Sequence, residues 1–469
     1  MKYSEFINTK NVNTVSSGIN VELSDLNPNL FDWQKPVVRW ALKKGRAALF
    51  LDTGLGKTVQ QLEWASQVCK KTGGNVLVLT PLAVAQQTVA EAVKHEIETP
   101  VRFCHDRSEV DGGISITNYQ KLDRFCVEDF DGIVLDESSI LKSIGGKTKE
   151  KLIESFQQTP YRLACTATPA PNDFMELGNH CDFLGVMTRG EMLSMYFVHD
   201  GGDTAKWRLK GHAESKFWEF MASWSVMIRK PSDIGFTDEG YNLPPLNFHT
   251  HEVQTSEKPA DYGLLFHEEA KTLGDQRHVR RTTINDRCKL AASLHDGTKQ
   301  TLVWCELNKE SDTVKSMIDG SINVEGSMKD DKKESALLGF SAGEIECLVT
   351  KPKIAGHGMN WQNCNRMIFL GLSHSFEQFY QSVRRCYRFG QTQPVDVHIV
   401  TTDRDAGILE NIKRKQADAD KMAEGMIAAM SDITSRVIRS TANIKTDYVP
   451  KAEMIVPRFL GVENEPSIV

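Results

Sequence analysis

The sequence predicts an α/β protein with two parallel-sheet lobes and a mostly helical insertion between them. Short apolar strands alternate with helical patterns over residues 31–169, and the same alternation returns over residues 285–403. Such alternation is typical of a parallel sheet covered by helices. The chain has 469 residues. A single hydrophobic core stops growing near roughly 250 to 300 residues, so two or three domains are expected.

The composition is that of an ordinary globular chain, with 40% hydrophobic and 25% charged residues. The 56 Lys plus Arg and 62 Asp plus Glu give a net charge of -6, so a polyanion site must be a local patch. Ten cysteines without a Cys-x-x-Cys pair fit reduced thiols, and we expect no structural metal. The N-terminus MKYSEFINTK has no apolar core for a signal peptide, and no uninterrupted apolar stretch reaches bilayer length, which predicts a soluble intracellular protein.

The first lobe is expected over residues 31–175, after an N-terminal extension of residues 1–30. Its predicted strands are the segments AALFL, NVLVLTP, ISITNY, GIVLDE and RLACTATP. The first of these strands runs directly into a glycine-containing loop, and a helical pattern follows the loop. Strand, tight loop and helix in this order predict a phosphate-binding turn.

In that turn, glycines allow backbone N–H groups to point inward and the helix N-terminus adds positive potential. A lysine can reach the outer phosphates and a threonine hydroxyl can ligate magnesium. The predicted nucleotide-binding residues are Thr53, Gly54, Leu55, Gly56, Lys57 and Thr58.

The fourth strand ends in Asp136 and Glu137, at the edge of the sheet where α/β proteins bind ligands. One carboxylate can hold magnesium while its neighbour orients and deprotonates the attacking water. The acid pair and the phosphate-binding turn together predict ATP hydrolysis.

Residues 176–246 are expected to form the insertion, which combines a Gly/Asp loop with the amphipathic segment ESKFWEFMASWSVMIRK. The second lobe is expected over residues 247–430, with strands TLVWCE, IECLVT, RMIFLG and VDVHIVTT. A long helix ends this lobe, and its stripe of Met422, Met426 and Met430 favours core packing over a partner groove. Residues 431–469 are expected to be a tail.

Seven segments in order resemble the motifs of superfamily-two helicases and translocases, and the chain is most similar to Swi/Snf-like ATPases of the compact bacterial or bacteriophage kind. The similarity extends from residue 31 to about residue 402. LDTGLGKT resembles motif I, VLVLTPLAV motif Ia, SITNYQKL motif Ib, VLDESSILK motif II, LACTATPAPND motif III, VTKPKIAGHGMNWQ motif V and QSVRRCYRFGQ motif VI. The resemblance implies two RecA-like lobes, with ATP and Mg²⁺ as cofactors. Ser138 and Ser139 stand where the family usually has Ala-His in motif II.

The resemblance also implies a role for single residues of the ATP site. Gln34 would read the adenine edge, Lys57 would hold phosphates, Thr58 and Asp136 would hold magnesium, and Glu137 would act on water. Gly358 and Asn360 of motif V would sense nucleotide and DNA.

Motif VI is expected on a helix that is capped by Gly390, with Arg385 and Arg388 on one face. A solvated basic face is the alternative to a functional one. By motif matching, both residues would be arginine fingers that neutralise charge on the γ-phosphate, whereas Arg384 aligns with a non-catalytic position.

Nucleic acid would be held through small hydroxyls and backbone N–H groups at the edges of both lobes. The residues implied by the resemblance are Thr80, Pro81, Thr117, Asn118 and Lys353. Candidate basic supplements are Trp207, Arg208 and Lys210 in the insertion and Arg277, Arg280 and Arg281 before the second lobe, with a solvated loop as an equal alternative for each group.

The leading functional prediction is an ATP-driven translocase on double-stranded DNA, in the cytoplasm of a bacterial cell or of a bacteriophage-infected host. A strand-separating DNA or RNA helicase is the second hypothesis. The third is a non-catalytic clamp or the motor subunit of a defence or modification complex. No membrane partner is expected.

Overall fold

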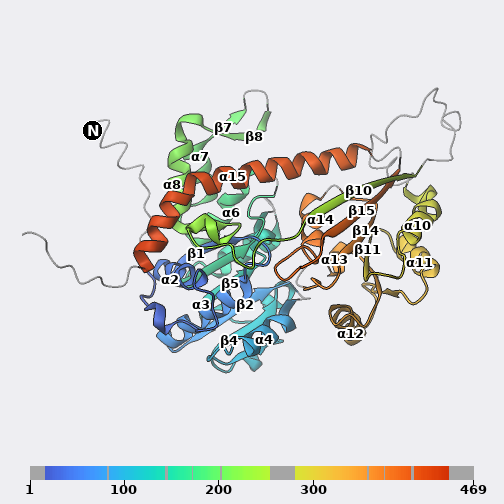
Figure 1. Ribbon diagram of the computed structural model, residues 1–469. Helices are drawn as coiled ribbons and strands as arrows, with labels where there is room; N and C mark the ends of the chain where they lie inside the picture. The colour runs from blue at the N-terminus through green and yellow to red at the C-terminus, as the bar shows by residue number, and fades with distance from the viewer. Residues whose placement is uncertain are drawn as a thin grey trace, which may run out of the picture.

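The computed structural model describes residues 16–81, 84–142, 146–171, 173–200, 203–253, 280–355, 359–373, 375–402 and 406–442. Two parallel sheets, each with helices packed against it, lie beside each other (Figure 1). The predicted α/β fold class with two RecA-like lobes is therefore confirmed.

The first lobe is built on a seven-stranded parallel sheet of order β3-β4-β2-β5-β6-β1-β9. Its strands are β1 (Arg46–Leu51), β2 (Asn75–Thr80), β3 (Val101–Phe103), β4 (Ile114–Asn118), β5 (Phe130–Asp136), β6 (Tyr161–Thr166) and β9 (Ser225–Ile228). Its helices are α2 (Gln34–Lys44), α3 (Lys57–Thr72), α4 (Ala85–Lys94), α5 (Lys147–Ser155), α6 (Leu177–Leu184), α7 (Arg189–Tyr196) and α8 (Glu214–Trp224).

Both faces of this sheet are covered, because its central strands are apolar at nearly every position. β1, β2, β5 and β6 are buried along almost their whole length. Trp40 and Trp64 pack on one face of the sheet, and Phe50 and Trp224 pack on the other. The carboxyl ends of these strands meet at one edge, where the predicted site residues lie.

The segment expected as a mostly helical insertion also contributes strands. α6, α7 and α8 pack into the core of the first lobe, and β7 (Phe197–Asp200) pairs with β8 (Asp203–Leu209) as an antiparallel hairpin. The amphipathic segment is helical only as far as Trp224, where α8 ends. The next residues, Ser225–Ile228, form β9, which pairs parallel to β1. Pairing with β1 overrides the helical pattern here, because it buries Val226 and Ile228 at the sheet edge.

The second lobe is built on a six-stranded parallel sheet of order β10-β15-β14-β11-β13-β12. Its strands are β10 (Leu246–Val253), β11 (Thr301–Cys305), β12 (Ile322–Asn323), β13 (Cys347–Thr350), β14 (Arg366–Leu370) and β15 (Val395–Thr402). Its helices are α10 (Ile284–Ser293), α11 (Asn308–Met317), α12 (Asp330–Ser341), α13 (Pro352–Ala355) and α14 (Phe376–Val383).

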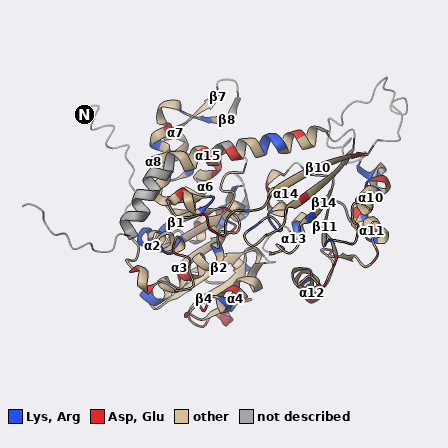
Figure 2. Cartoon of the chain, in the orientation of Figure 1, with Lys and Arg blue, Asp and Glu red and all other residues tan. Residues whose placement is uncertain are grey.

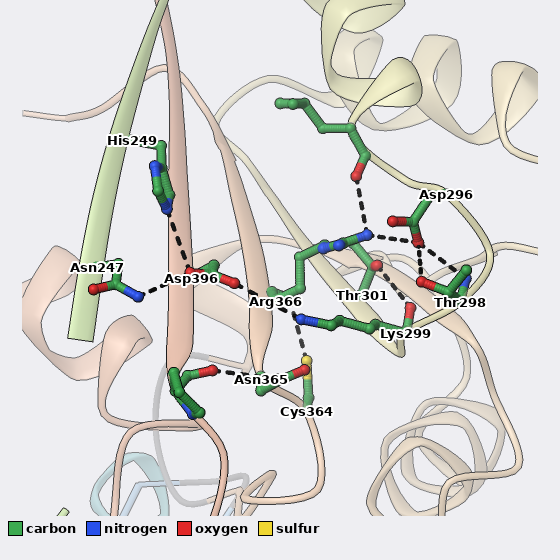
Figure 3. A network of polar contacts seen from close by, with 12 residues as sticks. Asn247, His249, Asp296, Thr298, Lys299, Thr301, Cys364, Asn365, Arg366 and Asp396 are labelled. Atoms are coloured by element: carbon green, nitrogen blue, oxygen red, sulfur yellow. Dashed lines mark hydrogen bonds and ion pairs between the residues drawn. The ribbon is translucent and has the colours of Figure 1, made fainter. Parts of the chain in front are cut away.

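Polar contacts run from the edge strand β10 towards the middle of this sheet (Figure 3). Asp396 of β15 accepts a hydrogen bond of 3.1 Å from the Asn247 side chain and lies 3.9 Å from the Lys299 ammonium group. In the neighbouring strand, Arg366 forms an ion pair of 2.7 Å with Asp296. The acidic partners Asp296 and Asp396 are 47% and 25% exposed, so solvent screens both pairs in part and each contributes little to stability.

A 37-residue helix, α15 (Ala406–Ala442), starts at the second lobe and extends across the first (Figure 1). It packs against α8, α2 and β9. Met426 is fully buried in a core cluster of the first lobe, as the packing interpretation of the methionine stripe predicts. The side chains of Met422 and Met430 lie outside the described residues.

Basic and acidic residues are interspersed over both lobes (Figure 2). Any polyanion contact therefore depends on local groups. None of the described helices combines the length and the hydrophobicity that a bilayer span requires.

Candidate functional site

The loop between β1 and α3 has the conformation of a phosphate-binding turn. Gly54 and Gly56 both have positive φ angles, of 86° and 68°, which side-chain-bearing residues rarely adopt. Gly56 precedes the first residue of α3, so the free N–H groups of the helix start inside the loop. The Lys57 ammonium group donates hydrogen bonds to the carbonyls of Leu51 and Asp52, at 2.9 and 3.2 Å. The loop thus curls around its own lysine.

Gln34, the first residue of α2, is hydrogen-bonded to this loop. Its side-chain N–H group donates to the Leu55 carbonyl at 3.0 Å, and its side-chain oxygen accepts from the Phe31 N–H at 3.0 Å. A Cβ atom on Gly56 would lie 2.5 Å from the Gln34 amide, which explains the glycine at this position. Gln34 is only 1% exposed. Contact with adenine stays a prediction for this residue.

The acid pair lies beside the loop, at the end of β5. Asp136 is buried, accepts a hydrogen bond of 2.7 Å from the Gln61 side chain and, through its carbonyl, one of 2.6 Å from the Tyr119 hydroxyl. Burial and the neighbouring charge of Glu137 raise the pKa of Asp136 to about 6. Glu137 has a positive φ of 53°, and the Thr166 hydroxyl lies 3.4 Å from its carboxylate.

Lys57 and the two carboxylates share one electrostatic environment. Burial lowers the pKa of Lys57, and the charges of Glu137, Asp52 and Asp136 act in the opposite direction. The oxygen of the Gln61 amide has no hydrogen-bond partner among the described residues, although it is buried beside Asp136. Carboxylate, amide and hydroxyl oxygens are the ligands that Mg²⁺ prefers, so this corner fits a divalent cation bound with phosphates.

Motif VI begins on α14, but the helix ends at Val383, before both candidate finger residues. The expectation that Arg385 and Arg388 lie on one helix with Gly390 as its cap is wrong. After Val383 the chain tightens into turns, in which the N–H groups of Arg385 and Cys386 bond three residues back. The Arg385 carbonyl accepts from the Trp361 N–H at 2.9 Å and is not used in an α-helix.

Both arginines are held by the second lobe. The Arg385 guanidinium donates to the carbonyl and the side-chain oxygen of Gln381, at 3.0 and 2.9 Å, and to the Met359 carbonyl at 3.3 Å. Arg388 donates to the same Met359 carbonyl at 3.3 Å. The segment around Met359 therefore fixes both guanidinium groups.

The electrostatic surroundings of the two arginines differ. Burial lowers the pKa of Arg385, while the charge of Glu137 acts against this shift. Burial and the charge of Arg385 lower the pKa of Arg388 to about 9, and the carboxylate that acts in the opposite direction is Glu91 of α4. Of the two arginines, Arg385 is thus the one whose charge interacts with the acid pair. Of the motif V residues, Asn360 is partly buried beside Met359, and Gly358 lies outside the described residues.

The comparisons with known proteins agree with this arrangement. Residues 33–196 match the SNF2-related domain, and residues 284–390 match the helicase conserved C-terminal domain. An uncharacterized ATP-dependent helicase of Bacillus subtilis (strain 168), YqhH, is 22% identical over 451 residues, which cover 84% of this chain and 78% of the relative. The chain belongs to the Swi/Snf-like ATPases of helicase superfamily two. It is a nucleic-acid-dependent ATPase.

In this Swi/Snf-like ATPase, the nucleic-acid contacts predicted for the first lobe involve buried residues. Thr80 and Thr117 are fully buried and Asn118 is 2% exposed, and the Thr80 hydroxyl donates to the Pro81 carbonyl at 3.1 Å. Their side chains are buried in this conformation and do not face solvent. Phosphate contact at these positions stays a prediction.

The predicted contacts of the second lobe are more accessible. Lys353 is exposed on α13, near the ends of the central strands. Arg280 donates to the Leu372 carbonyl, and its charge, like that of Lys353, acts on the carboxylate of Glu306. Arg277 lies outside the described residues. A local basic group therefore stands at the edge of the second sheet.

Several residues of the site were missed by sequence reasoning. Gln61 and Tyr119 hold Asp136, and Asp52 is contacted by Tyr380 and Arg384 of the other lobe. The sequence carries one usable signal, because Gln61 follows Lys57 by four residues and shares its helix face. The contacts of Asp52 with Tyr380 and Arg384 join residues more than 300 positions apart, so no local sequence pattern predicts them.

Proposed function

We propose that this protein is an ATP-driven translocase on double-stranded DNA. The observation that carries the proposal is the position of motif VI, which begins at the end of α14 and lies against the phosphate-binding loop of the first lobe. A Cβ atom on Gly54 of that loop would lie 2.9 Å from the backbone nitrogen of Phe389 in the second lobe. A nucleotide at this position would touch both lobes, so its turnover would change how they sit together.

In this proposal, Lys57 and the N-terminal N–H groups of α3 bind the phosphates, and Gln34 and the loop from Thr53 to Gly56 shape the site. Thr58 and Asp136 would hold Mg²⁺, which when bound neutralises phosphate charge. Glu137 orients the attacking water and accepts its proton. Arg385 and Arg388 reach charge on the γ-phosphate from the second lobe.

The preference for duplex DNA is supported by the match to the SNF2-related domain. A motor that follows one strand of a duplex needs few strong contacts, because each is released in every cycle. Lys353 and Arg280 of the second lobe, together with backbone groups near Pro81 and the region of Asn360, would supply them.

The test compares ATPase rates with single-stranded DNA, duplex DNA and RNA of equal length at one salt concentration. Duplex DNA should stimulate turnover most. Equal rates with and without any nucleic acid would contradict the proposal, and stimulation by RNA alone would change the substrate class. The variant Lys57→Ala is the control, because it should bring every rate to the background.

Strand separation is the second candidate, and one observation favours it. The β7–β8 hairpin projects from the first lobe (Figure 1). The relative YqhH also carries the name of a helicase. Displacement of a triplex-forming strand together with poor unwinding of a forked duplex would support translocation. Efficient unwinding of the fork, lost on shortening the hairpin, would support strand separation.

A further inference from the structure

Three polar contacts join α14 and its C-cap residue, Arg384, to the first lobe. The Tyr380 hydroxyl donates a hydrogen bond of 2.6 Å to the Asp52 carboxylate, and the Arg384 guanidinium lies 3.3 Å from the other carboxylate oxygen. Near the start of α14, Glu377 forms an ion pair with Lys142, the last residue of motif II. The helix that precedes the arginines is thus fixed to the first lobe at both ends.

These contacts determine the rotation of the helix. Tyr380 and Arg384 are four residues apart and therefore share one helix face, which is turned to Asp52. Gln381, which follows Tyr380 on α14, holds the Arg385 guanidinium through its side-chain oxygen and its carbonyl. A rotation that moved Arg384 away from Asp52 would also move Arg385 relative to the acid pair. The distance between fingers and carboxylates thus depends on Asp52.

The environment of the pair favours a defined geometry. Side-chain exposure is 14% for Asp52 and 20% for Arg384. Arg384 also stacks over the rings of Tyr380 and Tyr387, with centroids at 5.0 and 5.4 Å. Burial raises the pKa of the Asp52 carboxyl, but the charge of Arg384 and the hydrogen bond from Tyr380 outweigh this effect and hold the pKa below its usual value. The carboxylate therefore stays ionised and paired near neutral pH.

Asp52 also belongs to the phosphate-binding loop. Its carboxylate accepts from the Thr53 N–H at 2.6 Å, and its carbonyl accepts from Lys57. The residue therefore links the two partners that must meet during hydrolysis, namely the phosphate-binding lysine and the arginine segment.

We propose that Asp52, Tyr380 and Arg384 form a latch between the lobes that positions Arg385 and Arg388 for ATP hydrolysis. This inference rests on the finger role given to those arginines under the proposed function. In the latch, Asp52 and Arg384 are positioning residues, and neither contacts the reacting phosphate. Motif matching gave Arg384 no role, and the latch supplies one.

The test is a double-mutant cycle with Asp52→Asn and Arg384→Met. Asn keeps the acceptor for the Thr53 N–H, and Met keeps most of the length of the arginine without its charge. Each single change should lower kcat for ATP about tenfold, with KM changed less than about threefold, and the double variant should lose no more than the worse single variant. The expected coupling is thus about tenfold, or about 1.4 kcal/mol.

Two further variants complete the design. Arg384→Lys keeps the charge and should recover most of kcat, and Tyr380→Phe should lose less than Arg384→Met because only one neutral hydrogen bond is removed. The control is Arg102→Met, which breaks an exposed Arg102–Asp111 pair of 2.8 Å on β3, away from α14. That variant should leave kcat unchanged.

Three results would overturn the latch. Losses that multiply in the double variant would show that the residues act independently. A lower melting temperature with unchanged kcat would show a purely structural pair. Faster turnover in Arg384→Met without nucleic acid would show that the contact restrains the enzyme. The double-mutant cycle is measured with the nucleic acid that stimulates the wild-type ATPase most, so its result does not depend on a preference for duplex DNA. The proposed function fails separately, if duplex DNA does not stimulate the wild-type protein.

Discussion

Glu137 has a proposed catalytic carboxylate and a strained backbone conformation, and substitutions can separate the effect of the side chain on turnover from the effect of the strain on stability. Among the described residues other than glycine, only Glu96 and Glu137 have positive φ, and both angles are 53°. This conformation costs a side-chain-bearing residue roughly 1 to 2 kcal/mol, and glycine avoids the cost but loses about 0.5 to 1 kcal/mol in chain entropy. Glu137→Gly should therefore be more stable than Glu137→Gln by about 1 kcal/mol, while both variants lose turnover.

The measurement is a thermal melt of each variant, paired with its ATPase rate at saturating nucleic acid. For a lobe of about 200 residues, 1 kcal/mol corresponds to a shift of roughly 2 to 4 °C. Glu96→Gly is the matched control: Glu96 is exposed in the turn after α4, and its side chain also makes one weak hydrogen bond, of 3.4 Å. It should gain the same stability and keep full turnover. If Glu96→Gly is stabilised and Glu137→Gly melts no higher than Glu137→Gln, the strain argument for the catalytic residue is wrong.

Three further predictions follow from the site. Arg388→Ala and Arg385→Ala should each lower turnover roughly a thousandfold or more and keep ATP binding, as measured by nucleotide titration, and retention of more than about a tenth would remove the finger role. Burial lowers the pKa of His180 from 6.5 to about 4, so the unfolded chain takes up this proton first and stability falls as the pH drops from 6.5 to 4. In urea melts, the free energy of unfolding of His180→Gln should fall about 2 kcal/mol less between pH 7.5 and 5.0 than that of the wild type. An equal fall would contradict the lowered pKa of His180. Lys353→Ala should weaken binding to all sequences and reduce the salt slope by about one, whereas an unchanged slope would exclude a phosphate contact.

The central strands of both sheets were predictable because each is a short apolar run bounded by turn residues. β3, β9, β10 and the two-residue β12 were not, and for different reasons. β3 has only three residues, and β9 is decided by pairing with β1. β10 is exposed at most positions, so its sequence carries no apolar run. Strands at sheet edges depend on their neighbour more than on their own composition.

The candidate site shows the same division. The loop around Lys57 and the acids Asp136 and Glu137 could be predicted, because strand, turn and helix fix their geometry within a few residues. Their supports could not, because these come from distant elements. His180 of α6 is an example: its ring lies 3.0 Å from the Ser138 hydroxyl, beside the departure from the family pattern in motif II. No local sequence pattern predicts this contact, because the two residues are 42 positions apart.

The course of α15 has a consequence for how the chain folds during synthesis. Met426 fills the core of the first lobe, and Asp420 pairs with Arg229 of that lobe at 2.9 Å, yet both come from the far end of the described chain. A ribosome adds about 5 to 20 residues per second, so roughly ten to forty seconds pass between the synthesis of β9, the last strand of the first lobe, and that of Met426. During that time the apolar face next to α8 is uncovered. The first lobe therefore reaches its final packing only after the second lobe has been made, and a nascent chain arrested before α15 would present that face to chaperones.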